Sequence, residues 1–282
     1  MKKLWLAPLA ALVLLAGCHD EDHAPRDVIA PAAPRDVIAP AAPRGLTSVT
    51  GDGEVFLSWY ANTEGDVAGY RIYESGCASG PGCPYDRVGT TNGTSFIVTG
   101  LTNGVTRYFA VAAYDRAGNE SDLTYQDLQD TPRPEGFGRA LTEYGAAPAT
   151  AGYDFSAFAV RPWNDPATDV YFGLEGGVAR MIAPFTDTDI QDAGYALTLD
   201  AVDYAPNAGW SPTGKVDLIR GHCYVVRILN GVGGANYAKF RVTSVGSGSV
   251  VFDWAYQTAV DNRELKSAPV RNEAPRVRRV VS

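Results

Sequence analysis

Short runs in which every second residue is apolar, bounded by turn-forming residues, recur through most of this sequence. Val55, Leu57 and Trp59 follow this pattern, as do Tyr70 and Ile72. Successive side chains of a β-strand point to opposite faces of its sheet, so each run offers one apolar face for burial. The glycine and asparagine residues between the runs accept positive φ and favour turns. We therefore predict an all-β fold built from short strands.

The alternating runs fall into two groups, each large enough for a domain. Residues 44–132 have room for about seven short strands, which predicts an immunoglobulin-like sandwich. Pro132, Arg133 and Pro134 close this group. Residues 137–268 hold further strand-like runs without a long helical period. Here we predict a mainly antiparallel β domain of about seven to nine strands, arranged as a sandwich or a flattened barrel.

The second group contains a series of apolar runs and one acidic segment between them. The expected strands are 169–174, 178–182, 195–199, 215–219, 222–229, 237–245 and 249–256. Asp187, Asp189 and Asp192 precede Gly194 with a spacing that does not match the EF-hand calcium loop. We interpret the acidic segment as a solvated turn, with calcium coordination as the less favoured alternative.

The first residues carry the features of an export sequence. Lys2 and Lys3 precede an apolar run from Leu4 to Leu15. At about 12 residues, the run is too short for a permanent membrane-spanning helix, which needs about 20. A basic start, a short apolar segment and small residues at its end are typical of a cleaved signal peptide.

The apolar run ends in Leu15-Ala16-Gly17-Cys18, which resembles the lipobox of bacterial lipoproteins. The resemblance implies that residues 1–17 are removed and that acyl chains on Cys18 anchor the protein in a membrane. His19 follows, in place of the aspartate that resembles an inner-membrane retention signal, so an outer-membrane location is implied. A plain secretory signal with a chance cysteine is the less favoured alternative.

Residues 18–43 are interpreted as an unfolded linker rich in proline and alanine. Residues 24–32 recur unchanged as residues 33–41. The repeated prolines remove backbone donors and restrict the residues before them, so the repeat cannot form a helix. The repeat can be interpreted as a semi-rigid spacer. It can equally have arisen by slippage of a repeat in the coding DNA, with no selection on its length. Asp20-Glu21-Asp22 resembles the export tag of some surface lipoproteins, and a solvated acidic linker is the equal alternative.

Composition narrows the classes of function. Asp and Glu number 32 against 24 Lys and Arg, and the resulting net charge of −8 argues against a nucleic-acid partner. Three histidines and four cysteines argue against a zinc cage or a histidine-centred active site. Catalytic motifs such as the Gly-x-Ser-x-Gly elbow are absent from the sequence, so we expect no enzyme. A two-carboxylate glycosidase stays an open alternative.

Residues 269–282 are predicted to be a disordered basic tail.

Several motifs of the first group resemble a bacterial fibronectin type III domain. They are Gly51-Asp52-Gly53-Glu54-Val55, Asp66-Val67-Ala68-Gly69-Tyr70, Leu101-Thr102-Asn103-Gly104 and the segment from Ala113 to Ser121. The resemblance implies a spacer or adhesion module without catalytic residues, in which Trp59 is the core tryptophan. One position departs from the family pattern. Arg107 stands where the family usually has the tyrosine that ties down a corner of the sandwich.

Cys77 and Cys83 are separated by five residues in a segment rich in glycine and proline. In an exported protein, such a pair is expected to form a disulfide bond. A metal site is disfavoured because further ligands are lacking nearby. Cys223 is then left without a partner.

The last strands of the second group resemble the C-terminal part of HmuY-like surface lipoproteins, which bind haem or related ligands. The residues that carry the resemblance are 221–226, 237–244 and 252–257. Family members that ligate haem use a pair of axial residues, typically histidines. His222 is the sole histidine in the two predicted domains, and Met181 is a second axial ligand only in principle. The favoured alternative for His222 is a hydrogen-bonded strand residue beside a structural Cys223.

Trp210 lies in a predicted loop, residues 205–212, and is the aromatic residue most expected to be exposed. It is therefore our candidate for a glycan contact. A hydrophobic plug beneath the loop is the favoured alternative.

The leading hypothesis is a non-enzymatic, lipid-anchored protein of the cell envelope, surface-exposed or facing the periplasm. A fibronectin type III spacer would present a β domain that binds a ligand or a protein partner. The first alternative is a haem-capture lipoprotein using His222, and no other cofactor or metal is expected. The second is a carbohydrate-binding or adhesion protein using Trp210.

Overall fold

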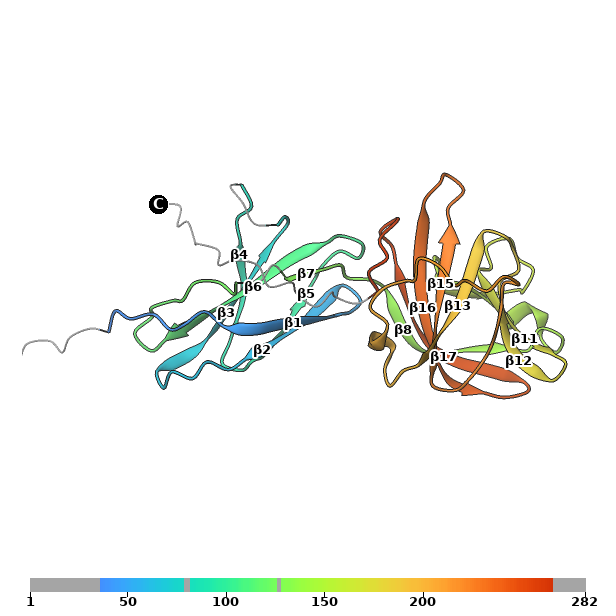
Figure 1. The fold of residues 1–282 in the computed structure, drawn as a ribbon, viewed down its shortest axis with the longest axis horizontal. Coiled ribbons are helices and arrows are strands. Elements are labelled where there is room, and N and C mark those ends of the chain that lie inside the picture. The colour runs from blue at the N-terminus through green and yellow to red at the C-terminus, as the bar shows by residue number, and fades with distance from the viewer. Residues whose placement is uncertain (1–35, 79–81, 126–127, 266–282) are drawn as a thin grey trace, which may run out of the picture. The chain divides into compact units, whose positions relative to one another are not determined.

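The computed structural model describes residues 36–78, 82–125 and 128–265, and it is built from β-strands (Figure 1). The all-β prediction is confirmed, because helical structure in the described residues is restricted to two short 3-10 turns, Pro148–Thr150 and Leu199–Ala201. In the same residues, we find no helix with the length and apolar character needed to cross a membrane. Cys18, most of the proline-rich linker and the basic tail lie outside the described residues.

The first domain is a sandwich of two antiparallel sheets. One sheet has the order β1-β2-β5, and the other has the order β4-β3-β6-β7. The strands are β1 (Arg44–Thr50), β2 (Glu54–Tyr60), β3 (Val67–Ser75), β4 (Asp86–Thr91), β5 (Ser95–Thr99), β6 (Arg107–Asp115) and β7 (Leu128–Asp130). This division into three and four strands is the arrangement expected of a fibronectin type III domain.

The core of the first domain follows the period-2 alternation of the sequence. Val55, Leu57 and Trp59 on β2 are 0%, 0% and 5% exposed. The Trp59 ring packs edge-on against Tyr70, with ring centroids 5.4 Å apart. Phe109 on β6 closes the core from the other sheet and is fully buried. The predicted core role of Trp59 is therefore confirmed.

The corner that lacks the usual tyrosine is tied by other side chains. The amide oxygen of Asn103 accepts a hydrogen bond from the Gly53 backbone at 2.9 Å, and its Nδ2 donates to Asp52 at 2.7 Å. Arg107, at the tyrosine position, forms an ion pair with Glu74 on β3 at 3.2 Å. Hydrogen bonds between two turns and one ion pair between strands thus connect this part of the sandwich.

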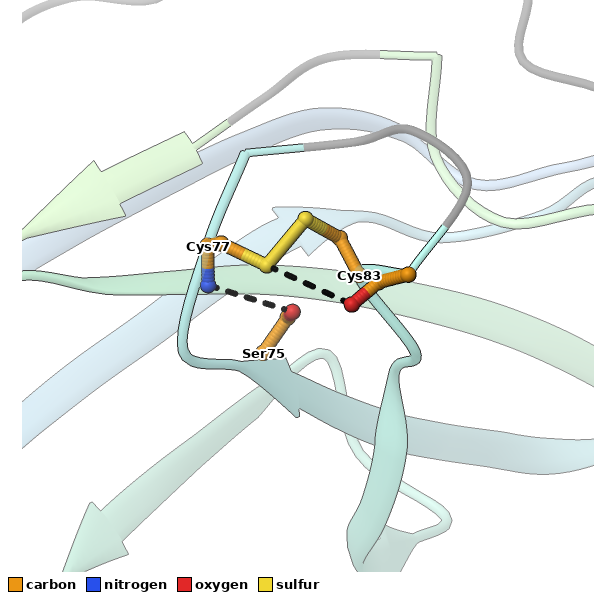
Figure 2. The surroundings of a disulfide bond; sticks show 4 residues. Ser75, Cys77 and Cys83 are labelled. Atoms are coloured by element: carbon orange, nitrogen blue, oxygen red, sulfur yellow. Dashed lines mark hydrogen bonds between the residues drawn. A yellow bond between two sulfur atoms is a disulfide. The ribbon is translucent and has the colours of Figure 1, made fainter.

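Cys77 and Cys83 form a disulfide bond, as predicted (Figure 2). Their Cα atoms lie 5.6 Å apart, and the bond links the end of β3 to the approach to β4. The Cys77 backbone N–H also donates to Ser75 Oγ at 3.4 Å. The bond therefore closes the connection between two neighbouring strands.

The second domain is also a sandwich, which decides between the two predicted arrangements. Its sheets have the orders β10-β9-β11-β12-β14 and β13-β15-β16-β17-β8. The strands are β8 (Glu135–Thr142), β9 (Gly152–Asp154), β10 (Ala159–Arg161), β11 (Val170–Glu175), β12 (Val178–Ile182), β13 (Thr188–Tyr195), β14 (Lys215–Asp217), β15 (His222–Leu229), β16 (Ala235–Val245) and β17 (Ser249–Gln257). The described residues thus hold ten strands in this domain, one more than the upper predicted number.

Aromatic side chains from both sheets fill the space between them. Phe240 on β16 stacks on Tyr224 of β15, with ring centroids 4.9 Å apart. Tyr153 on β9 meets Phe252 of β17 edge-on at 5.6 Å. These four rings are fully buried. The interior is therefore a packed core, and ligands must bind at the surface or at the ends of the sandwich.

The acidic segment predicted to be a turn is mostly strand β13, and the strand predicted at 195–199 is not formed. Thr188 and Ile190 on β13 are buried, so one face of the strand joins the core. The acidic side chains are compensated by the neighbouring strand β15. Asp189 bonds with Arg227 at 2.5 and 2.9 Å. The prediction of a solvated turn was wrong because this pairing across strands is not visible in the local sequence.

Opening the disulfide should weaken the first domain. The Cys77→Ala/Cys83→Ala double variant is expected to lose about 2 kcal/mol of unfolding free energy, because a short loop constrains the unfolded chain only modestly. Denaturant unfolding of the full chain, followed through its tryptophan fluorescence, to which Trp59 of the first domain contributes, measures the change. Reduced wild-type protein should match the double variant, and equal stability of the oxidised and reduced proteins would contradict the prediction.

Candidate ligand-binding site

His222 is the first residue of β15 and lies at one end of the β13-β15-β16-β17-β8 sheet. Its Nδ1 lies 3.0 and 3.1 Å from the two carboxylate oxygens of Asp192, and its side chain is 21% exposed. Tyr195 is its register partner on β13 and is 69% exposed. Leu197 and Ile219 lie close by along the chain and are also exposed. This end of the sheet therefore presents apolar side chains beside an imidazole held by a carboxylate.

The contact with Asp192 determines what His222 can do. A neutral imidazole that donates Nδ1–H to a carboxylate keeps the lone pair of Nε2 for another partner. Among the described residues, none bonds to Nε2 of His222. The arrangement is suited to a ligand contact or to metal ligation at the surface.

Met181 does not complete an axial pair with His222. It lies on β12, in the opposite sheet, and is fully buried in the core. Its register partners are Phe172 and Val216, which also face the core. The described residues contain no histidine other than His222, so they supply no histidine pair for haem.

Trp210 is half-buried instead of exposed. Its ring packs against a small apolar cluster on the outer face of the sheet, consisting of Ala205, Val225, Ala235, Tyr237 and Leu265 with Val202 beside it. The Arg227 guanidinium lies 5.0 Å above the ring centroid. Because Val225 and Arg227 alternate with His222 along β15, the two candidate residues lie on opposite faces of the sheet. The structure does not bring them into one site.

A buried charged cluster lies on the same outer face, and sequence reasoning missed it. Lys239 on β16 is fully buried, donates to the Val202 carbonyl at 3.2 Å and lies 3.7 Å from Asp200. Arg133, also fully buried, pairs with Asp200 at 3.4 Å and Glu135 at 3.2 Å. These contacts hold the chain around Asp200 against the sheet. A lysine in the middle of an alternating apolar strand was the available sequence signal.

Burial raises the pKa of Glu135 in this cluster, and it also shifts the ionisation of Lys239 and of Cys223 on the same face. Burial lowers the pKa of Lys239 to about 7, and the positive charge of Arg133 adds to this effect. Burial raises the pKa of Cys223 to about 11. The Cys223 thiol therefore stays protonated at neutral pH and behaves as a packing residue, not as a nucleophile.

The described residues hold two other features that resemble sites, an acidic cluster and a shallow pocket. Carboxylate oxygens of Asp36, Asp66 and Asp115 lie within 4.8 Å of one another. However, both oxygens of the buried Asp115 accept hydrogen bonds from Asn119, at 2.8 and 2.7 Å. A shallow pocket of about 570 Å³ is lined by Thr186, Asp187, Leu229, Asn230 and Gly231. It lies at the opposite end of β13 and β15 from His222.

The curated proteins that match this chain act on polysaccharides by name. No protein family model matches the chain. Exoglucanase B of Cellulomonas fimi is 28% identical over 233 residues, which is 79% of this chain and 20% of that enzyme. Chitinase D of Niallia circulans is 41% identical over 100 residues, or 33% of this chain and 17% of that enzyme. Amylopullulanase of Thermoanaerobacterium saccharolyticum is 33% identical over 99 residues, 35% of this chain and 7% of that enzyme. The chain thus spans at most a fifth of these relatives.

Solved structures that resemble the chain include fibronectin type III-like domains. An Fn3-like protein from Clostridium thermocellum is 26% identical, covers 31% of this chain and 88% of its own, and has a TM-score of 0.27. A β-1,2-glucanase from Parabacteroides distasonis is 28% identical over 37% of this chain and 14% of its own, with a TM-score of 0.30. A DUF4466 family protein from Parabacteroides merdae covers 77% of this chain and 99% of its own at 10% identity, with a TM-score of 0.38.

The lowered pKa of Lys239 makes stability depend on pH. Between about pH 7 and 10, the unfolded chain holds a proton on this lysine that the folded protein has released, so stability should rise with pH, by at most about 1.4 kcal/mol per pH unit. We expect Lys239→Met to flatten this rise in denaturant titrations between pH 7 and 8.5. Cys223→Ala is the control and should keep the rise. An unchanged slope in Lys239→Met would contradict the prediction.

Proposed function

We propose that this protein is an exported, lipid-anchored component of the cell envelope without enzymatic activity. In this proposal, the fibronectin type III domain is a spacer and the second sandwich binds a ligand. The observation that carries the proposal is the Cys77–Cys83 disulfide bond. Such bonds persist in oxidising compartments and are rare in the cytosol, which agrees with the signal-peptide pattern of the first residues.

The anchor in this proposal is Cys18, followed by the proline-rich linker. The first sandwich adds a second, folded spacer. The order of lipobox, linker, spacer and second sandwich suits a protein that presents its last domain away from the membrane.

Two buried carboxyl groups of the second sandwich serve structural contacts. Burial raises the pKa of Asp169 to about 7. Its carboxylate accepts a hydrogen bond from the Phe155 backbone at 2.7 Å, and the side chain is 9% exposed. Asp154, 3% exposed, is held by Arg161 at 2.8 Å and by the backbone of Ala157 at 2.9 Å. Both groups are engaged in holding a turn and are shielded from a substrate.

The matched relatives favour a carbohydrate as the ligand. Exoglucanase, chitinase and amylopullulanase are names of polysaccharide-degrading enzymes. The stretches matched in the chitinase and the amylopullulanase are about the length of one fibronectin type III domain, near 100 residues. We therefore infer that this chain shares the accessory modules of such enzymes and works beside polysaccharides.

Haem binding is the second candidate, and His222 is the observation that favours it. Its Nδ1 is held by Asp192, which leaves Nε2 for a ligand. The exposed Tyr195 and Leu197 offer an apolar flank. A single histidine at this surface would ligate the iron from one side only.

Lipid anchoring is tested by metabolic labelling with palmitate. We expect label on the wild-type protein and none on Cys18→Ala, because the lipobox cysteine supplies the acylated thiol. Cys223→Ala is the matched control and should label like the wild type. Equal labelling of wild type and Cys18→Ala would overturn the proposed anchor.

The haem candidate is tested by titrating haemin into the purified full chain. If His222 ligates iron, the Soret band shifts, and His222→Ala weakens the binding strongly. Asp192→Asn should weaken it by roughly tenfold or more, because the carboxylate orients the imidazole. Met181→Leu should leave the titration unchanged. A titration without a Soret shift removes this candidate.

A further inference from the structure

Three aromatic rings from separate chain segments meet on the outer face of the β10-β9-β11-β12-β14 sheet. They belong to Tyr144, Trp163 and Tyr171, and all three side chains are half-buried. The ring centroids lie 5.3 Å apart for Trp163 and Tyr171, 5.4 Å for Tyr144 and Tyr171, and 5.7 Å for Tyr144 and Trp163. We call these three residues the aromatic triad.

The triad lies on the side of the sheet that faces away from the core. On β11, Val170 and Phe172 point into the core, and Tyr171 alternates with them. Trp163 follows β10 in a loop, where its backbone N–H donates to the Pro148 carbonyl at 3.0 Å. The Tyr144 N–H donates to the Phe172 carbonyl at 3.1 Å. The positions of both loop residues are thus fixed by backbone contacts.

Gly173 makes room for the Tyr144 ring. A Cβ atom at this position would lie 2.8 Å from Cδ1 of Tyr144, which is closer than real side chains approach. The absent side chain lets the Tyr144 ring lie over Gly173 and meet the Tyr171 ring edge-on. A glycine inside a strand often marks such a close approach.

A ladder of charged side chains continues the same face beside the triad. Register pairs Gly173 with Arg180 and Arg180 with Asp217, so these positions share the outer face. Arg180 bonds with Glu175 at 2.9 Å and with Asp217 at 2.8 Å, and Lys215 bonds with Glu175 at 2.5 Å. The two cations and two anions cancel in charge. The ladder nevertheless offers several donors and acceptors at the surface.

We propose that the aromatic triad and the charged ladder form a binding surface for a neutral saccharide chain. This inference rests on the proposed function, and it names the ligand class and the surface that binds it. The C–H face of a sugar ring stacks on an aromatic ring, whose face carries partial negative charge, while the hydroxyl groups require nearby hydrogen-bond partners. The triad supplies the aromatic rings, and the ladder supplies the hydrogen-bond partners.

The charge balance of the ladder selects among ligand classes. A nucleic acid or an acidic polysaccharide requires uncompensated cations, whereas both cations of this ladder are paired with carboxylates. Aromatic groups at a surface also occur in protein interfaces, and the experiment below distinguishes that case. The paired charges and the polysaccharide-acting relatives together favour a neutral saccharide.

The test uses the purified full chain in mild detergent with insoluble chitin, insoluble cellulose and soluble pullulan as probes. We expect retention by at least one probe, and Tyr171→Ala should weaken it by roughly tenfold. Tyr171→Phe keeps the ring and should retain binding. Tyr60→Ala, at an exposed tyrosine of the first sandwich, is the matched control. The tryptophan fluorescence of wild-type protein, to which Trp163 contributes, should change when the saccharide is added, which gives a readout that does not depend on a variant folding.

Three outcomes would overturn the inference. They are no retention by any of the three probes, equal binding by wild type and a folded Tyr171→Ala, and loss of binding with Tyr195→Ala or Trp210→Ala instead. Concentration-dependent dimerisation abolished by Tyr171→Ala would assign the triad to an interface between copies. If saccharide binding is not observed but Cys18 still carries the palmitate label, the saccharide inference is rejected and the envelope proposal stands. Loss of that label with saccharide retention intact would reject the anchor alone.

Discussion

Each sheet of this protein has one apolar face that must be covered, and the rest of the structure depends on this constraint. In the second sandwich, rings such as Tyr224, Phe240 and Tyr153 cover those faces and leave the interior filled. Burying an aromatic side chain contributes about 1.5–3 kcal/mol, so this core supplies a large share of the stability. A filled core moves ligand binding to the outer faces and ends.

The two outer faces of the second sandwich differ in what covers them. On the β13-β15-β16-β17-β8 sheet, the chain around Asp200 is held by Lys239 and Arg133, and Trp210 packs over the adjoining apolar cluster. Removing one partner of such a buried cluster leaves an uncompensated charge, which is strongly destabilising. The other outer face carries half-buried aromatic rings and a neutral ladder. The outer face of the β13-β15-β16-β17-β8 sheet is thus covered by a small additional core. The outer face of the other sheet is suited to a ligand.

The success of sequence-based prediction followed the strength of the local pattern. Strands such as β2 and β15 were predicted closely because one face is deeply buried and alternation is strong. Four strands of the second sandwich were missed, β8, β9, β10 and β13. β8, β10 and β13 are edge strands, and β9 is only three residues long. An edge strand has one partner only and exposes more of its side chains, so its apolar pattern is weak. Asp189 on β13 was read as part of a turn because its partner Arg227 is distant in sequence.

The sequence by itself determined the all-β class, the core role of Trp59 and the Cys77–Cys83 pair, because each depends on spacing within one segment. Only the tertiary structure decided that Trp210 is covered, that Met181 lies apart from His222, and that Tyr144, Trp163 and Tyr171 meet. The physical reason is strand register. Pairing between distant segments sets which side chains are neighbours on a sheet face, and the local sequence does not encode that pairing.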